Sequence, residues 1–349
     1  MAKILILGAG VMGSAFSFPP ADLGHEVRLT GTHLDTEIVR ALKTSRIHPK
    51  LNMELPDKVN FYFHEELGLA LEGQIDLIVL GVSSAGVDWA VKALGPLLTK
   101  PVPVIMLTKG LAVAGDRLMI LPRFVSDGLE AFGAGRFTVG AVGGPCIAGE
   151  LAARRDTRVT FAWSDSDKFH WLDSLFRAAY YHINYTTDLT GLEICAAMKN
   201  FYALAVGYPS GLLEATEAPA NKAQMHNLSA GLFAQSVKEM AKLVEWMKGD
   251  LKNVYGLAGV GDLYVTCQAG RNSRMGRYLG TGMTYSQAKR EKMAADTVEG
   301  AELALAIGPL LERLFRGGTL SAGEYPLTVA IINAVCHDAL MRIPWESFD

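Results

Sequence analysis

The chain has 349 residues, of which 50% are hydrophobic and 20% are charged, and its formal net charge is −3 at pH 7. This composition excludes a disordered chain, and the length allows two domains with cores of their own. The acidic balance, without a basic stripe, argues against nucleic acid or an anionic membrane surface as a partner.

The four cysteines are Cys146, Cys195, Cys267 and Cys336. They lie far apart and form no CxxC pair, so neither a zinc site nor a redox motif is indicated, and no metal is expected. Residues 1–7 are a short, mostly apolar run, but Gly8 and Gly10 interrupt it before a secretory core could form. No stretch reaches membrane-spanning length without a charge or glycine break. We therefore expect a cytoplasmic protein without stable membrane insertion.

The first half of the chain alternates between buried strands and helices. Predicted strands cover residues 3–7, 25–30, 76–81 and 102–107, and further strand candidates cover 137–142 and 158–163. Helical segments fit between them, for example residues 85–98. Such alternation predicts a parallel, doubly wound sheet.

From about residue 187 the pattern becomes helical, with apolar residues at three- and four-residue spacing. Predicted helices cover residues 190–206, 228–247, 301–315 and 327–340. Good strand candidates disappear, and the polar stretch 214–223 predicts a surface loop. We therefore expect a second domain that is mostly helical.

A GxGxxG motif, formed by Gly8, Gly10 and Gly13, directly follows the first predicted strand. The first glycine permits a tight turn, the second lets the backbone approach a pyrophosphate, and the third lets helix pack on strand. The phosphates then meet free N–H groups at a helix N-terminus. The motif predicts an α/β N-terminal Rossmann domain, residues 1–189, that binds a dinucleotide, followed by an all-α substrate and catalytic domain, residues 190–349.

Pro19 and Pro20 fall where the helix after the glycines should run. A proline inside a helix costs about 3 kcal/mol. This helix is therefore predicted to be short, kinked or restarted at Pro20.

About twenty residues past the glycines, an acid would bind the ribose 2′-hydroxyl of NAD. Here the sequence reads Thr30-Gly31-Thr32-His33, with no acid until Asp35. This neutral, hydroxyl-rich segment could accept a 2′-phosphate, with His33 or Arg40 nearby, or leave the ribose poorly discriminated. The choice between NAD and NADP stays open.

Hydride reduction of a carbonyl requires a proton donor that stabilises the developing alkoxide. Lys199 lies in an apolar helical segment whose only other charged residue is Glu193. It either snorkels to the surface or is aimed into a site. Lys109 follows a buried strand, whose carboxyl end would face the ligand crevice, or it is an ordinary loop lysine. Asp262 lies in an apolar segment and, if buried, requires a cationic partner such as a catalytic lysine.

Two further charged positions admit both a functional and a structural interpretation. Arg271, followed by Asn272, comes after a glycine, where an arginine suits bidentate recognition of phosphate or is merely a charged loop residue. Glu299, in a Val-Glu-Gly segment, is ambiguous on composition.

Together these segments resemble the NAD(P)-dependent glycerol-3-phosphate dehydrogenase family. The matching segments run in order over nearly the whole chain: GAGVMG, LTKGL, GPCIAGELA, DLTGLEICAAMKN, GLAGVGDLYVTC, GRN and VEG. The family's fold, a Rossmann domain followed by a helical domain, agrees with the pattern described above. The resemblance implies a cytoplasmic, homodimeric oxidoreductase of glycerophospholipid metabolism. It would use NAD or NADP to reduce a small phosphorylated ketone, dihydroxyacetone phosphate, to sn-glycerol 3-phosphate.

The resemblance also implies roles for individual residues. Lys199 aligns with the lysine that donates a proton to the substrate carbonyl, Lys109 with a second active-site lysine, and Asp262 with the carboxylate that orients the catalytic lysine. The implied substrate-binding residues are Asn200, Thr266, Arg271 and Asn272. The implied cofactor-binding residues are Gly8, Gly10, Val11, Met12, Gly13, Thr32, His33, Lys109, Ala148, Arg271 and Glu299.

The sequence departs from the family pattern at positions that set cofactor and substrate choice. Cys146 and Ile147 follow Pro145, Thr30 takes the place of a tryptophan, and Gln235-Ser236 replace Arg-Gly. The alternatives are therefore a dehydrogenase acting on another sugar or polyol phosphate or on a hydroxy acid, and a non-catalytic dinucleotide-binding protein. The Arg271-Asn272 pair argues against an unphosphorylated substrate. The presence of Lys199 and Asp262 argues against a non-catalytic protein.

Overall fold

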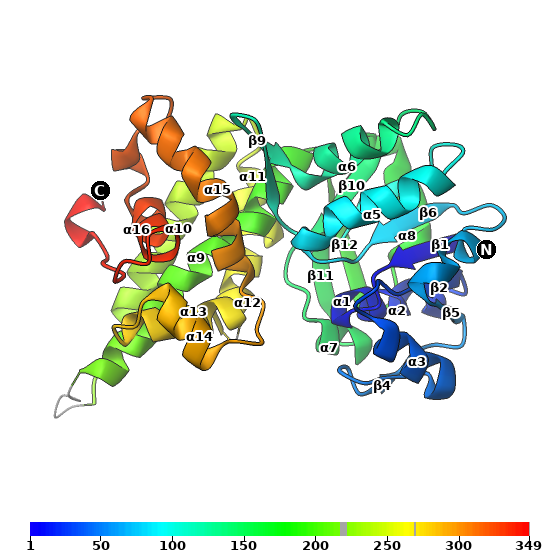
Figure 1. Cartoon of the computed structure of the whole chain (residues 1–349), viewed down its shortest axis with the longest axis horizontal. Coiled ribbons are helices and arrows are strands. Elements are labelled where there is room, and N and C mark those ends of the chain that lie inside the picture. Colours follow the sequence, from blue (N-terminus) through cyan, green and yellow to red (C-terminus); the bar gives the residue numbers. More distant parts are fainter. Residues whose placement is uncertain (217–221, 269, 349) are drawn as a thin grey trace. The chain divides into compact units, whose positions relative to one another are not determined.

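The structure is a computed structural model that describes residues 1–216, 222–268 and 270–348 (Figure 1). The chain forms two compact units, the first comprising Met1–Lys109 and Leu121–Leu192 and the second Gly110–Ile120 and Glu193–Asp349. The sequence did not predict that residues 110–120 belong to the second unit. The predicted division into domains 1–189 and 190–349 stays a prediction, because compactness alone does not show which segments fold independently.

The first unit is built on an eight-stranded sheet with the order β12-β11-β10-β7-β6-β1-β2-β5. The strands are β1 (Lys3–Leu7), β2 (Glu26–Thr30), β5 (Val59–Tyr62), β6 (Leu77–Leu80), β7 (Val104–Met106), β10 (Val139–Gly143), β11 (Thr157–Ala162) and β12 (Tyr181–Thr186). All neighbours pair in parallel except β10 and β11, which are antiparallel. Because the order extends in both directions from β1, the predicted doubly wound, mostly parallel sheet is confirmed.

Two strands that the sequence did not predict, β5 and β12, lie at the two edges of this sheet. An edge strand is not buried on both faces, so it has no continuous aliphatic run. In β12, buried Tyr181 and Ile183 alternate with half-buried His182 and Asn184. The predicted strands, by contrast, match the interior strands β1, β2, β6, β7, β10 and β11.

Helices connect the strands of the first unit. They are α1 (Val11–Phe16), α2 (Phe18–Asp22), α3 (Thr36–Ser45), α4 (Leu67–Ala70), α5 (Val87–Leu94), α6 (Leu121–Glu130), α7 (Ala148–Ala152) and α8 (Phe169–Phe176), with a small hairpin of β3 (Ile47–His48) and β4 (Met53–Glu54). The first helix ends at Phe16 and a new one begins at Phe18, so Pro19 and Pro20 lie in the first turn of α2. A proline is tolerated there because its missing N–H has no partner within the helix. The predicted interruption is confirmed.

The second unit combines one hairpin with helices (Figure 1). The hairpin consists of β8 (Leu111–Ala114) and β9 (Arg117–Ile120), and the helices are α9 (Leu189–Ala215), α10 (His226–Trp246), α11 (Lys252–Tyr255), α12 (Asp262–Gln268), α13 (Arg271–Gly280), α14 (Tyr285–Lys292), α15 (Glu299–Arg316) and α16 (Pro326–Cys336). Each predicted helix is present, although α16 ends four residues early. Residues 217–221 of the predicted surface loop lie outside the described residues. Among the helices that the structure describes, none is long and apolar enough to cross a bilayer.

Helices α9 and α13 pack backbone against backbone through four glycines, Gly207, Gly211, Gly276 and Gly280, which we call the glycine seam. A Cβ atom on any of them would lie 1.7–2.2 Å from a carbonyl oxygen of the facing helix. Real Cβ atoms do not approach that closely, so only glycine fits. The seam holds the start of α13 close to the middle of α9, which determines which side chains of the two helices meet.

A fully buried carboxylate, Glu239 of α10, ties α10 to α16. One oxygen accepts hydrogen bonds from Gln235 Nε2 and Leu327 N–H, both at 2.7 Å, and the other accepts from the N–H and Oγ1 of Thr328 at 2.8 and 2.7 Å. Tyr202 of α9 then donates to Thr328 Oγ1 at 2.9 Å, because that hydroxyl's own proton points to Glu239. Burial raises the pKa of the Glu239 carboxyl. Gln235, one of the departures from the family pattern, is thus part of this network.

Candidate active site

The glycine-rich turn after β1 has the shape that a dinucleotide requires. Gly8 has φ +115°, and a Cβ there would lie 2.7 Å from the carbonyl group of Gly81. A Cβ on Gly13 would lie 2.0 Å from the Gly8 oxygen, whereas nothing lies within 4 Å of the Cβ position of Gly10. Gly8 and Gly13 are therefore required by the turn and by helix packing, and Gly10 leaves open space on the side where a pyrophosphate binds. Val11 and Met12 form the first turn of α1, whose N–H groups have no partner within the helix.

The segment after β2 is organised around Asp35. Its Oδ2 accepts hydrogen bonds from the N–H and Oγ1 of Thr32 at 2.8 and 2.9 Å. The exposed ring of His33 lies edge-on to the rings of Trp89, with centroids 5.4 Å apart, and His64, at 6.4 Å. These residues follow β2, β5 and β6, so they lie at the carboxyl edge of the sheet, where ligands of this fold bind. Arg40, the other cation considered for a 2′-phosphate, pairs instead with Glu37.

Lys109 lines a small cavity of about 30 Å³ together with Met12, Cys146 and Tyr181. It follows β7, and Met12 belongs to the glycine-rich motif, so the cavity adjoins the predicted cofactor site. The Tyr181 hydroxyl is fully buried and, within the described residues, has no hydrogen-bond partner, and burial raises its pKa. Cys146, whose presence had no explanation from the sequence, fills one wall of this cavity. Ala148 is the first residue of α7, directly after this segment.

In the second unit, Lys199 of α9 and Asp262 of α12 form a buried ion pair. The two residues are only 6% and 2% exposed. A single π-helical turn, Leu257–Gly261, precedes α12 and makes Asp262 the first residue of that helix. Such turns are frequent at functional sites. Lys199 does not snorkel to solvent, and the cationic partner that a buried Asp262 requires is this lysine.

The residues that neighbour this pair in sequence, and their partners, form further hydrogen bonds. The amide of Asn272 donates to Asn200 Oδ1 at 3.0 Å, and its own oxygen accepts from the Gly300 N–H at 2.8 Å. Thr266 Oγ1 donates to the backbone oxygen of Asp262 at 2.7 Å, which leaves the Asp262 carboxylate available to Lys199. The two asparagines meet because the glycine seam brings α13 against α9.

Arg271 and Glu299, the first residues of α13 and α15, form an ion pair with each other. Both side chains are substantially exposed. An arginine has five N–H donors, so this pairing leaves donors for a second anion. Burial raises the pKa of the Cys267 thiol to about 12, which favours the protonated thiol at neutral pH.

The predicted site residues thus form two sets, one in each unit. The second unit holds Lys199, Asn200, Asp262, Thr266, Arg271, Asn272 and Glu299, and the first holds Gly8, Gly10, Val11, Met12, Gly13, Thr32, His33, Lys109 and Ala148. Sequence reasoning missed the contribution of Gly300, which acts through its backbone and so has no side-chain signal. It also missed His48, which is fully buried and contacts the glycine-rich loop.

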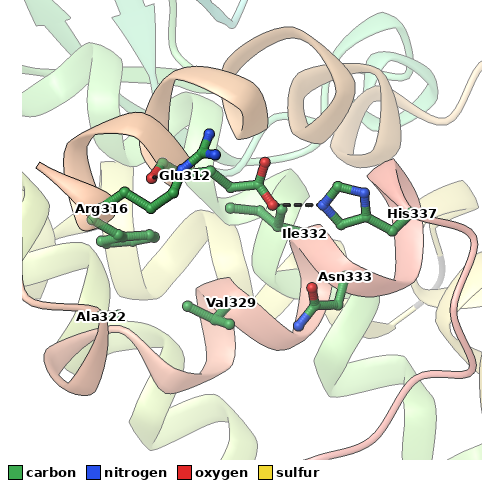
Figure 2. Close-up of a pocket in the computed structure, with 8 residues that line it drawn as sticks. Glu312, Arg316, Ala322, Val329, Ile332, Asn333 and His337 are labelled. Atoms are coloured by element: carbon green, nitrogen blue, oxygen red, sulfur yellow. Dashed lines mark hydrogen bonds and ion pairs between the residues drawn. The ribbon is translucent and has the colours of Figure 1, made fainter.

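A pocket of about 420 Å³ between α15 and α16 contains none of these residues (Figure 2). Its wall is mainly apolar, with Phe315, Val329 and Ile332, and the Glu312 carboxylate points toward the His337 ring at 2.6 Å. Pocket volume alone therefore does not point to the predicted site residues.

Comparison with known proteins agrees with this geometry over both units. Residues 3–169 match the N-terminal part of NAD-dependent glycerol-3-phosphate dehydrogenase, and residues 188–342 match its C-terminal part. The chain belongs to this family. The NADP(+)-dependent glycerol-3-phosphate dehydrogenase of Archaeoglobus fulgidus is 34% identical over 303 residues, which cover 86% of this chain and 87% of the relative.

Two further comparisons extend the similarity. The glycerol-3-phosphate dehydrogenase [NAD(P)+] of Shouchella clausii is 32% identical over 318 residues, covering 90% of this chain and 88% of the relative. The crystal structure of glycerol-3-phosphate dehydrogenase from Coxiella burnetii superimposes with a TM-score of 0.80 at 25% identity, covering 99% of this chain and 97% of that one. Family membership confirms the resemblance, the Rossmann-plus-helical fold class and the expectation of an enzyme that depends on NAD or NADP.

Proposed function

We propose that this protein transfers a hydride between NAD(P)H and dihydroxyacetone phosphate, forming sn-glycerol 3-phosphate, with Lys199 as the proton donor. The observation that carries the proposal is the buried ion pair of Lys199 with Asp262. Lys199 is only 6% exposed as a residue; a charge so buried is costly to maintain unless it serves a site, and the carboxylate keeps it charged. The names of the similar proteins from Archaeoglobus fulgidus and Shouchella clausii support the choice of substrate.

In the proposed reaction, Lys199 Nζ donates a hydrogen bond to the carbonyl oxygen of the substrate. When bound, the nicotinamide supplies the hydride to the carbonyl carbon and is itself oxidised. As negative charge develops on the oxygen, Lys199 transfers a proton to it, which gives the secondary alcohol and a neutral amine. Asp262 then favours reprotonation of that amine from solvent, because a buried carboxylate stabilises the ammonium form.

Substrate positioning is assigned to the residues next to the ion pair. Arg271 binds the phosphate with its remaining guanidinium donors, and Asn272 orients the substrate from its bond to Asn200. Binding energy gained at the phosphate then places the carbonyl against Lys199. Lys109 is assigned as a second active-site lysine, and the glycine-rich loop with Thr32 and His33 is assigned to the cofactor.

Steady-state oxidation of NADH and of NADPH with dihydroxyacetone phosphate tests the reaction. Lys199→Ala should lower kcat by about 10²–10⁴-fold, the usual contribution of a general acid, while dinucleotide binding is retained. Lys242→Ala is the matched control, because Lys242 forms a surface ion pair with Glu324 on another part of the unit. Near-normal turnover by Lys199→Ala would exclude the lysine as the acid. Wild-type protein that binds a dinucleotide but does not turn over would point to another sugar or polyol phosphate or a hydroxy acid.

The resemblance extends the proposal to cellular context. It supports a cytoplasmic enzyme of glycerophospholipid metabolism that forms a homodimer and binds a small phosphorylated substrate. Sedimentation velocity of the purified protein tests the dimer, because monomeric protein at micromolar concentration would contradict it.

A further inference from the structure

The peptide units around Ala9, in the middle of the glycine-rich loop, are held from two sides by residues distant in sequence. The Ala9 N–H donates to Asp35 Oδ2 at 3.2 Å. The Ala9 carbonyl oxygen lies 3.1 Å from His48 Nε2 and also accepts from Ser14 Oγ at 3.1 Å. Ala9 itself is fully buried, so these bonds are shielded from water.

The hydrogen bonds of His48 define its tautomer. Nδ1 lies 3.1 Å from the backbone N–H groups of Lys50 and Leu51, so it must accept. Nε2 therefore carries the proton and donates to the Ala9 oxygen. The neutral ring, fully buried at the end of β3, thus links the β3–β4 hairpin to the glycine-rich loop. Burial lowers the pKa of His48, which agrees with a neutral imidazole.

Asp35 occupies the region where this fold usually places the acid that reads the ribose 2′-hydroxyl. In this chain, its Oδ2 instead accepts three hydrogen bonds, from Ala9 N–H, Thr32 N–H and Thr32 Oγ1. With three donors, Oδ2 has little capacity left for a sugar hydroxyl, so only Oδ1 could still accept one. Its geometry suits holding the loop better than binding the ribose.

We propose that Asp35 and His48 are positioning residues for the cofactor: they clamp Ala9 from its N–H and its C=O side and so set the backbone of the glycine-rich loop that binds the dinucleotide phosphates. The inference rests on the dinucleotide site of the proposed function. It assigns Asp35 to the loop and away from the ribose, so the clamp acts equally on NADH and NADPH, which share the pyrophosphate.

Two substitutions at His48 separate its two hydrogen-bonding roles. In His48→Asn, Oδ1 takes the place of Nδ1 and retains the hairpin bonds but cannot donate to Ala9. In His48→Gln, the longer amide reaches the Nε2 position and restores that donor. Loss of one buried hydrogen bond should raise the Kd of both dinucleotides about tenfold in His48→Asn. His48→Gln should stay within about threefold of wild type.

The measurement is titration calorimetry of the full chain with NADH and with NADPH, alongside KM for each and kcat. The KM for the dinucleotide should rise with Kd, and by more than kcat falls. Two results would overturn the role of His48: an equal loss of dinucleotide affinity in His48→Asn and His48→Gln, or wild-type dinucleotide affinity in a folded His48→Asn. Binding is measured without substrate, so it tests the clamp separately from the reaction. If the protein binds the dinucleotide but does not turn over, only the proposed reaction is contradicted.

Asp35→Ala supplies an independent test that leaves the β3–β4 hairpin intact. A clamp predicts that the Kd values of NADH and NADPH rise by the same factor, about tenfold. If Asp35 instead bound the ribose, the two Kd values would change differently. Its removal would weaken the binding of NADH and leave the binding of NADPH unchanged or stronger. That outcome would overturn the assignment of Asp35.

Discussion

Breaking the buried Lys199–Asp262 pair from one side should destabilise the protein strongly. In Asp262→Asn, the ammonium of a residue only 6% exposed loses its carboxylate partner, and leaving one charge of a buried pair uncompensated costs about 3–5 kcal/mol. A domain of 150–250 residues shifts by about 2–4 °C per kcal/mol, so the Tm of the second unit should fall by roughly 6–20 °C.

The assays are thermal unfolding for the Tm and urea unfolding for the free energy of unfolding, both followed by far-UV circular dichroism, with the m-value compared between variants. The double variant Lys199→Met/Asp262→Asn is the control, because methionine matches the lysine stem and removes the buried charge. It should recover most of the lost stability, since replacing a buried ion pair by uncharged groups is often close to neutral. If Asp262→Asn stays within about 0.5 kcal/mol of wild type, the effect is that of an ordinary surface substitution, and the reasoning from burial is wrong.

Three further predictions concern stability. Glu239→Gln should lower the free energy of unfolding in urea by about 2–4 kcal/mol. The glutamine NH₂ group would face two donors whose hydrogen bonds a carboxylate oxygen accepts in the wild type, and an unchanged free energy would contradict the network. Burial lowers the pKa of His48 below the usual 6.5, so the contribution of His48 to stability is complete above pH 6.5 and is lost as the pH falls below that value. The Tm should therefore decline less between pH 6.5 and 5 in His48→Asn than in wild type. Parallel declines would refute the assignment. Gly276→Ala should lower the free energy of unfolding by about 3 kcal/mol, because its Cβ would lie 1.9 Å from the Leu204 oxygen. Gly68→Ala in α4, with open space around it, should raise the free energy of unfolding by about 0.5–1 kcal/mol. Equal effects would exclude close packing as the cause.

The interior of the sheet could be predicted because its strands are buried on both faces and read as aliphatic runs. Strand β1 and the glycine motif after it gave the fold class and the cofactor class from the sequence alone. Edge strands β5 and β12 were not predicted because one face of each is not fully buried. Their alternation is short and includes polar residues, which a search for buried runs does not detect.

A contact between two candidate residues could be predicted where each conflicts with its surroundings. Lys199 is a charge in an apolar helix and Asp262 a carboxylate in an apolar turn, and each conflict indicated a partner. Prediction failed where a residue acts through the backbone or through burial. His48 is one histidine among many by sequence, and only the tertiary fold shows that its ring spans two loops.

The glycine seam has a consequence for how activity responds to heat and denaturant. Van der Waals contact between two backbones has no flexible side chain to take up a displacement, so a small slip of α13 along α9 separates Asn272 from Asn200 while both helices stay intact. Enzymatic activity should therefore disappear under milder conditions than helical content does. In that case inactivation would report the loosening of this helix pair before the chain unfolds.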